Sequence, residues 1–215
     1  MLPALLKLKL ATSAALGVAA ATGGAPAPAQ AMAALVAERA SLPVEVSLYD
    51  ENLRVHATVA IRRDGSMDEA TAAEVKHLFR CRQTNHERPI ARKTLAMLAD
   101  LADRYHGKTI EFVSVYRVQR GESPTSPHRD ARAIDFRIRG LPLPEIRDYL
   151  WRTYSDVGIG WYPGEQFIHM DSRPGLHDTA WTFVDGENHY HPYWAEVARS
   201  PAHAPTPRPT HRPGA

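Results

Sequence analysis

The sequence predicts an α+β fold in which a mainly antiparallel central sheet is flanked by helices. Segments with the alternation or the β-branched composition of strands come early in the chain and again in its second half, with two helical patterns between them. Strands followed by helices and then by strands favour this class over the regular alternation of a doubly wound fold. The 44% hydrophobic and 23% charged residues are close to the averages of globular domains.

The first predicted elements are a hairpin and two helices. Residues 44–49 and 53–61 alternate apolar and polar side chains, as half-buried strands do, and a turn joins them. Asp68 is placed as the N-cap of the first helix, which carries its last apolar residues at 78–79. Apolar residues at helical spacing predict the second helix over residues 88–105.

The later elements alternate between core strands and one helix. β-branched and aromatic residues mark the strands, and the Pro142-Leu143-Pro144 segment marks the start of the helix. The predicted strands are residues 109–116, 133–138, 158–162 and 166–171, and the predicted helix is residues 144–154.

Residues 1–31 have the pattern of a signal peptide. Lys7 and Lys9 precede an apolar run over residues 10–21, and Ala29-Gln30-Ala31 fits a small-x-small cleavage site. The run is short and rich in alanine for a transmembrane span, so an uncleaved membrane anchor is the less favoured alternative. We therefore expect an exported protein, periplasmic or secreted, that meets a membrane only through an uncleaved signal.

Residues 200–215 form a second segment outside the domain. Five prolines in sixteen residues are incompatible with helix or interior strand, which predicts a disordered, solvated tail. The folded domain is therefore expected over residues 32–199, which is long enough to bury a core.

Composition excludes several classes of function. Lys and Arg number 26 and Asp and Glu 24, a balance that does not fit a dedicated nucleic-acid binder. A single cysteine, Cys81, excludes an internal disulfide framework and a thiolate-rich zinc cluster. The 11 histidines are the first indication of chemistry.

A metal site is suggested by two histidines and a carboxylate in apolar strands. His128 precedes Asp135 by seven residues, and Asp135 lies in a strand where a lone carboxylate is costly unless it is paired or binds a metal. His169 lies in a similar strand, with Asp171 at same-face spacing. Such a set is typical of catalytic zinc, with the fourth position left for water. Hydrogen-bonded core histidines remain an alternative on spacing alone.

The segment around His128 resembles a known zinc-peptidase signature. Ser126-x-His128-x-x-Ala131-x-Ala133-x-Asp135 is similar to the Ser-x-His-x-x-Gly-x-Ala-x-Asp motif of zinc D-Ala-D-Ala peptidases. That superfamily includes D-Ala-D-Ala carboxypeptidases and dipeptidases, murein endopeptidases and the hedgehog signalling domain. Residues 157–163 and 167–171 resemble the aromatic-Pro turn and the Phe-Val-His-x-Asp motif of its small exported branch, which is similar to murein endopeptidase K.

The resemblance extends over residues 44–181 and implies a fold, a cofactor and ligands. It implies a hedgehog- and DD-peptidase-like fold and one Zn²⁺ per chain, held by His128, Asp135 and His169. The general base is left open, because related enzymes carry Glu, Asp or His two or three residues before the last histidine, at positions that are Gln166 and Phe167 here.

Two carboxylates are candidates for that base, and two further residues for substrate binding. Asp171 shares a strand face with His169 and is the preferred base, the alternative being that it orients His169. Glu165 is one position from the usual base site, and a loop could bring it in. The resemblance implies that Arg117 binds or polarises the substrate carbonyl and that Ser126 holds substrate or fixes its loop.

The expected function is that of an exported zinc-dependent peptidase acting on peptidoglycan stem peptides or crosslinks, at bonds of the D-Ala type. The alternative is a catalytically inactive zinc-binding domain on the same scaffold. His189-Tyr190-His191 could offer ligands at strand spacing, but the neighbouring aromatic residues favour a packed or surface segment, with a place in the cleft lining as a further alternative.

Overall fold

The computed structural model describes residues 30, 32, 38 and 41–200. The expected signal peptide, apart from Gln30, and the expected tail, apart from Ser200, lie outside the described residues. The chain divides into two compact units, Met1–Glu38 and Arg39–Ala215, and the second contains the sheet. Among the described helices none is long and apolar enough to cross a membrane.

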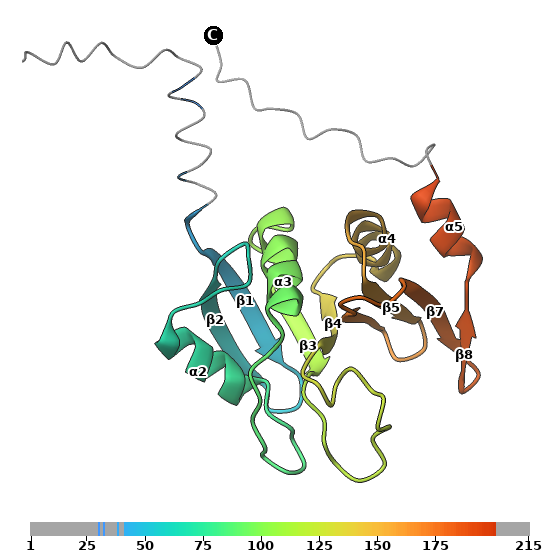
Figure 1. Ribbon diagram of the computed structural model, residues 1–215, viewed down its shortest axis with the longest axis horizontal. Coiled ribbons are helices and arrows are strands. Elements are labelled where there is room, and N and C mark those ends of the chain that lie inside the picture. The colour runs from blue at the N-terminus through green and yellow to red at the C-terminus, as the bar shows by residue number, and fades with distance from the viewer. Residues whose placement is uncertain (1–29, 31, 33–37, 39–40, 201–215) are drawn as a thin grey trace, which may run out of the picture. The chain divides into compact units, whose positions relative to one another are not determined.

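The centre of the domain is one sheet of eight described strands in the order β2-β1-β3-β4-β6-β5-β7-β8 (Figure 1). The strands are β1 (Val44–Asp50), β2 (Val55–Ile61), β3 (Ile110–Ser114), β4 (Ala133–Ile138), β5 (Val157–Tyr162), β6 (Phe167–Ser172), β7 (Thr179–Val184) and β8 (Glu187–Tyr190). The helices are α2 (Glu69–Leu78), α3 (Arg92–Arg104), α4 (Leu143–Thr153) and α5 (Tyr193–Arg199).

The α+β class is confirmed, but the sheet is mixed where a mainly antiparallel one was expected. Antiparallel pairings predominate, while β1 with β3 and β5 with β7 pair in parallel. The first parallel pair arises because α2 and α3 form a crossover that returns the chain beside β1. The second arises because β6 already occupies one side of β5, so that β7 joins the other side after a further reversal.

Several predicted boundaries shift by a few residues for local reasons. Asp68 caps α2 as expected, since its side chain accepts a hydrogen bond from Thr71 N at 2.8 Å. Helix α3 begins at Arg92 and not at residue 88, because Pro89 disfavours a helical residue before it and Ala91 is extended, with φ −58° and ψ 132°. Strand β3 ends at Ser114, after a register shift against β4.

The last two strands and α5 were not predicted. Strand β7 alternates small or polar with aromatic residues, and Asp185-Gly186 joins it to β8 with φ of 53° and 83°. Two consecutive left-handed residues are the geometry of a type I′ hairpin turn, for which Asp-Gly is a strong signal. His189 and Tyr190 lie in β8, whose side chains are all exposed.

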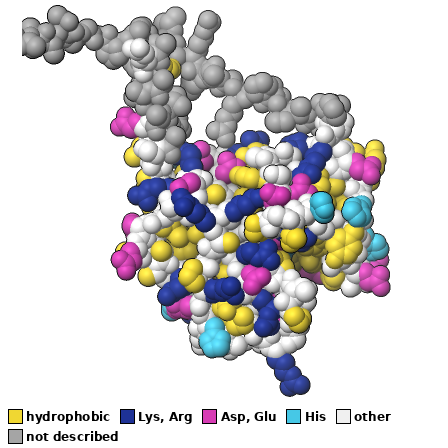
Figure 2. All heavy atoms as spheres, in the orientation of Figure 1, with side chains coloured by type: hydrophobic (Ala, Val, Ile, Leu, Met, Phe, Trp, Pro, Cys, Tyr) yellow, Lys and Arg dark blue, Asp and Glu magenta, His cyan; other side chains and the backbone are white. Residues whose placement is uncertain are grey.

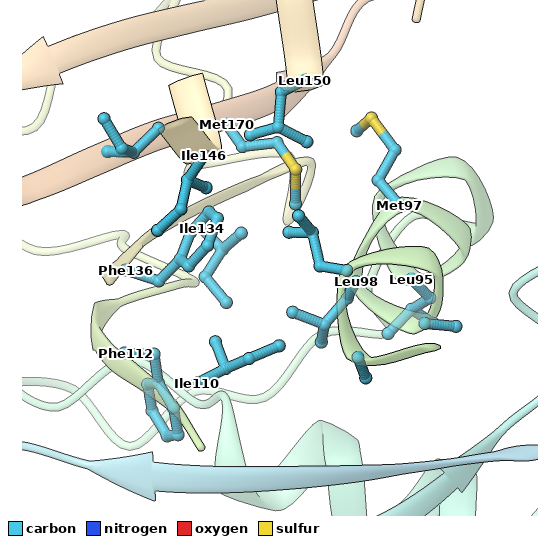
Figure 3. Packing of buried hydrophobic residues seen from close by; sticks show 14 of the residues in the cluster. Leu95, Met97, Leu98, Ile110, Phe112, Ile134, Phe136, Ile146, Leu150 and Met170 are labelled. Carbon is cyan, nitrogen blue, oxygen red and sulfur yellow. The ribbon is translucent and has the colours of Figure 1, made fainter. Parts of the chain in front are cut away.

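Helices α3 and α4 cover one face of the sheet (Figure 1), and the core lies between these helices and the sheet (Figure 3). Leu95, Met97 and Leu98 of α3 and Ile146 and Leu150 of α4 pack against strand residues. Those strand residues include Ile110, Phe112, Ile134, Phe136 and Met170.

Successive side chains of a strand point to opposite faces of the sheet, so the residues next to the core residues point away from the helices. Because Ile134, Phe136 and Met170 point to the helices, Asp135 and His169 point to the opposite face. Figure 2 shows basic and acidic side chains interspersed over the visible surface, as the balanced composition predicts.

Candidate metal centre and substrate cleft

Three buried side chains converge on the sheet face opposite α3 and α4. His169 Nδ1 lies 2.8 Å from Asp135 Oδ1 and 3.2 Å from His128 Nε2. His128 Nε2 is also 3.3 Å from Asp135 Oδ2. One ligand atom from each residue lies within 4.8 Å of the others, which is the geometry of a group that could hold a metal ion. The structure thus brings together the three ligands expected from the sequence.

We call His128, Asp135 and His169 the triad. Cross-strand pairing positions two of its members. Asp135 and His169 are directly paired residues on the antiparallel strands β4 and β6, so their side chains lie next to each other on one face. His128 comes from the loop between β3 and β4, which projects past the strand ends in Figure 1.

The ring of His128 is oriented by the end of β3. Its Nδ1 lies 2.5 Å from the carbonyl oxygen of Val115, the residue after the strand. A hydrogen bond from Nδ1 to this carbonyl leaves the lone pair of Nε2 directed at the triad. Backbone hydrogen bonds between Arg117 and His128, at 3.3 Å, and between Ala131 and His128, at 3.1 Å, fix the loop further.

The second ring nitrogen of His169 faces Asp171. Nε2 lies 3.1 Å from Asp171 Oδ2, and Arg173 donates to both oxygens of Asp171 at 2.8 and 3.0 Å. Asp171 is fully buried, which opposes ionisation, but the hydrogen bonds from His169 and Arg173 lower the pKa of Asp171 to about 2. Asp171 is therefore an ionised carboxylate that faces Nε2 of His169, the ring nitrogen on the side away from His128 and Asp135.

The electrostatics of the triad suit a cation. Burial lowers the pKa of His169, but Asp135 and Asp171 raise it to about 9. Burial likewise opposes ionisation of Asp135, yet the two histidines hold its pKa well below the usual range. Two imidazole nitrogens and an ionised carboxylate form the donor set that Zn²⁺ accepts, so the residues present fit the metal.

Two glycines of β5 make room for the partners of His169. A Cβ at Gly158 would collide with Asp171 and the guanidinium of Arg173, and a Cβ at Gly160 would collide with the indole of Trp181. Through the space at Gly160, the Trp181 ring packs on His169 with 5.1 Å between ring centroids. Asp171 was considered from the sequence as a residue that orients His169, whereas the support from Arg173 and Trp181 was not predicted, although the Gly158-Ile-Gly160 alternation was a signal for it.

The triad opens into a cleft of about 470 Å³. Its aromatic wall is formed by Tyr162, Phe167, Trp181 and Tyr190, and hydroxyl groups come from Ser123, Thr125 and Ser126. The cleft also contains Arg117 and Arg173, so cations border the triad. This volume is that of a ligand site for a short peptide and not of a single water.

Arg117 and Ser126 lie in the cleft, as expected. Arg117 Nη1 is 3.5 Å from Asp135 Oδ2, and its Nε forms an ion pair with Glu122 at 3.1 Å. The Ser126 hydroxyl accepts a hydrogen bond from the backbone N–H of His128 at 3.3 Å. Ser126 thus stabilises the turn that carries a triad histidine.

The two carboxylates considered as bases lie elsewhere. Asp171 is behind the His169 ring and does not line the cleft. Glu165 is exposed in the turn before β6, beside a separate hollow that it shares with Phe183 and Val184. Asp135 is the one acid among the described residues of the cleft lining.

The family model for the peptidoglycan L,D-endopeptidase MepK matches residues 38–177, a range that contains the triad, Arg117, Ser126 and Asp171. The chain belongs to this family. The MepK match ends before Trp181 and Tyr190, so part of the aromatic wall lies beyond the matched segment.

Individual MepK relatives match parts of the chain. It is 40% identical to the probable peptidoglycan L,D-endopeptidase MepK of Haemophilus influenzae over 58 residues, 27% of this chain and 31% of the relative. It is 29% identical to the peptidoglycan L,D-endopeptidase MepK of Escherichia coli K12 over 120 residues, 49% of this chain and 63% of the relative. The match thus spans less than two thirds of either relative. No solved structure matches the chain significantly.

Proposed function

We propose that this protein is an exported zinc peptidase that hydrolyses peptide bonds in the crosslinks or stem peptides of peptidoglycan. The observation that carries the proposal is the buried triad at the base of a peptide-sized cleft. Family membership supports peptidoglycan as substrate, and the names of the relatives favour a bond between an L- and a D-configured centre.

The proposed metal ligands are His128 Nε2, a carboxylate oxygen of Asp135 and His169 Nδ1. When bound there, Zn²⁺ would activate water and polarise a carbonyl group as a Lewis acid. Three protein ligands leave a coordination position on the cleft side for these purposes. One Zn²⁺ per chain is expected, because His128, Asp135 and His169 are the one such group found among the described residues.

Asp171 is assigned the positioning role and not that of the base. Its oxygens are already engaged by His169 and by both donating nitrogens of Arg173, and it is fully buried behind the ring. A carboxylate on the outer nitrogen of a ligand histidine fixes the ring and its tautomer. Glu165 has no catalytic role in this proposal, because it lies in an exposed turn outside the cleft.

Arg117 is assigned to substrate binding. Glu122 and Asp135 hold its guanidinium at the cleft, where a fixed cation can bind a substrate carbonyl or carboxylate. Ser126 supports the His128 loop through its hydrogen bond to the His128 N–H. Stem peptides carry free carboxylates, which the two arginines of the cleft would attract.

A zinc-binding domain without hydrolytic activity is the second candidate. The observation in its favour is that no described acid other than the ligand Asp135 lines the cleft, so a carboxylate base is not in place. Such a protein would bind muropeptides in the cleft and release them unchanged.

Turnover of defined muropeptides separates the two functions. The full mature chain would be incubated with purified crosslinked and uncrosslinked muropeptides, with zinc, with chelator, and with zinc restored, and the products identified by mass spectrometry. The proposal expects cleavage that chelator abolishes and zinc restores. Binding without cleavage would favour the second candidate, and cleavage that is indifferent to chelator would refute a zinc peptidase.

Export is tested separately. If residues 1–31 are a signal peptide, the mature protein begins at Met32. Mass spectrometry of the native protein from the cell envelope or medium should show this terminus. An intact Met1 in the cytoplasmic fraction would refute both processing and access to peptidoglycan.

A further inference from the structure

The aromatic wall of the cleft contains the hydroxyl group of Tyr162, which has no role in the function proposed above. Strand β5 presents Gly158, Gly160 and Tyr162 on the site face, since they alternate along the strand. The two glycines are covered by the partners of His169. Tyr162 is thus the first residue of this face of β5 whose own side chain reaches the cleft.

The ring of Tyr162 is held from both sides. It stacks on Phe167 with centroids 4.4 Å apart and planes at 20°, and on Phe183 with centroids 5.1 Å apart and planes at 25°. These neighbours come from β6 and β7, the strands that flank β5 in the sheet. A ring between two nearly parallel rings has little freedom to tilt, so the direction of its hydroxyl is fixed before substrate binds.

The hydroxyl is tied to the triad through one indole. Trp181 Nε1 donates to Tyr162 Oη at 3.2 Å, and the same ring packs on His169. An indole nitrogen is only a donor, so the Tyr162 oxygen is the acceptor and keeps its own hydrogen. Within the part of the chain that the structure describes, no side chain or backbone group accepts that hydrogen.

The surroundings of Tyr162 keep it protonated. Burial is the main cause that raises its pKa above the ordinary value, and the carboxylate of Asp135 adds to the effect. Trp181 and Arg117 act in the opposite direction without reversing it. Tyr162 is consequently a neutral donor at physiological pH and not a base.

Arg117 and Tyr162 lie on opposite sides of His169. In the strand order β3-β4-β6-β5-β7, the central β6 carries His169, Arg117 follows β3, and Tyr162 ends β5. A substrate carbonyl at the triad would therefore meet a cationic donor from one side and a neutral donor from the other.

We propose that Tyr162 is a catalytic residue whose hydroxyl donates a hydrogen bond to the carbonyl oxygen of the scissile peptide as negative charge develops on it. This assignment rests on the proposed function. Donors that are fixed in advance toward a developing oxyanion contribute more to the transition state than to substrate binding. The effect of losing the hydroxyl should therefore appear in kcat and not in KM.

The test is Tyr162→Phe in the full zinc-loaded chain, because this change keeps the stacked ring and removes only the hydroxyl. We expect kcat on the muropeptide that the wild type cleaves to fall by about 10²–10³-fold, with KM within about threefold. The control is Tyr193→Phe, which removes a hydroxyl from an exposed ring of α5 outside the cleft lining and should leave kcat within about twofold of the wild type.

Two readouts other than turnover separate catalysis from support. Zinc content should remain one per chain and the melting temperature close to that of the wild type. Calorimetric titration with a phosphinate analogue of the cleaved dipeptide, a mimic of the tetrahedral state, should show an affinity loss that follows the loss in kcat.

The outcomes distinguish this assignment from the proposed function. The assignment expects kcat to fall at least about a hundredfold. A Tyr162→Phe enzyme that retains about a third or more of the wild-type kcat would overturn the role of Tyr162 and leave the proposed function standing. Loss of zinc, or equal weakening of substrate and phosphinate, would make Tyr162 a structural residue. A wild type that binds zinc and cleaves no muropeptide would refute the proposed function and this assignment with it.

Discussion

The two sides of the candidate centre are built in different ways. On the β4–β6 side, Asp135 and His169 meet because they are paired across neighbouring strands and carry the reactive groups themselves. On the β5–β7 side, Trp181 reaches His169 because Gly160, the residue between them in the sheet, has no side chain. The first side depends on which residues are present, and the second on a side chain that is absent.

This difference implies two kinds of sensitivity to mutation. Changes to Asp135 or His169 on the β4–β6 side remove ligand atoms and should act on metal binding directly. Changes on the β5–β7 side leave every ligand in place and should act on the position of the His169 ring and on substrate. The following predictions test this division, from the largest expected effect to the smallest.

The largest effect is expected from the two ligand histidines. His128→Ala or His169→Ala removes one of three ligands, so the purified chain should lose stoichiometric zinc and all zinc-dependent turnover. Metal analysis after dialysis measures this. His189→Ala is the matched control, since His189 is exposed on β8, and it should retain one zinc per chain. Retention of zinc in both ligand variants would show that the triad is not the metal site.

A smaller effect is expected from Asp171→Asn, which removes the charge that supports the outer nitrogen of His169. Zinc affinity should fall about 10–100-fold, as for other partners of ligand histidines. Competition with a zinc chelator measures the affinity. If affinity is unchanged while turnover falls by about 10²–10⁴-fold, Asp171 acts as the general base after all.

Gly160→Ala tests the aromatic side, because the new methyl group would occupy the position of the Trp181 ring. Overpacking of this kind should lower the free energy of unfolding by about 1–3 kcal/mol. Urea denaturation measures the change, and Gly164→Ala is the control, since a Cβ at Gly164 has no neighbour within 4 Å. Equal stabilities for the two variants would mean that the gap at Gly160 is not required.

The smallest effect is expected from Glu165→Gln. Glu165 is exposed and faces a hollow outside the cleft, so kcat/KM should change by less than about twofold, as is usual for surface substitutions. Steady-state kinetics on the cleaved muropeptide would measure it. A large loss of turnover with zinc retained would identify Glu165 as the base and would require the turn before β6 to rearrange.

The sequence was most informative where chemistry and local pattern coincide. His128, Asp135 and His169 could be grouped because polar residues in apolar strands need partners, and the structure brings them together. The hairpin of β1 and β2 and the cap at Asp68 follow from residues close to one another in the chain. The hairpin and the cap could be predicted without knowing the order of the strands in the sheet.

The parts that escaped prediction depend on strand order and register. The parallel pairing of β5 with β7 cannot be read from either strand alone, yet it places Trp181 opposite Gly160. The position of Asp171 behind His169 depends on which ring nitrogen faces Asp135. The Asp185-Gly186 turn was a local signal for the last hairpin and was available in the sequence.

The central claim is that His128, Asp135 and His169 bind zinc, and anomalous diffraction at the zinc edge from crystals of the zinc-loaded full chain tests it most directly. The account predicts one peak per chain, at about 2.0–2.1 Å from His128 Nε2 and His169 Nδ1 and about 2.0–2.2 Å from an oxygen of Asp135. A peak at His189 or His191 with none at the triad would contradict it, as would a peak bound to His169 through Nε2.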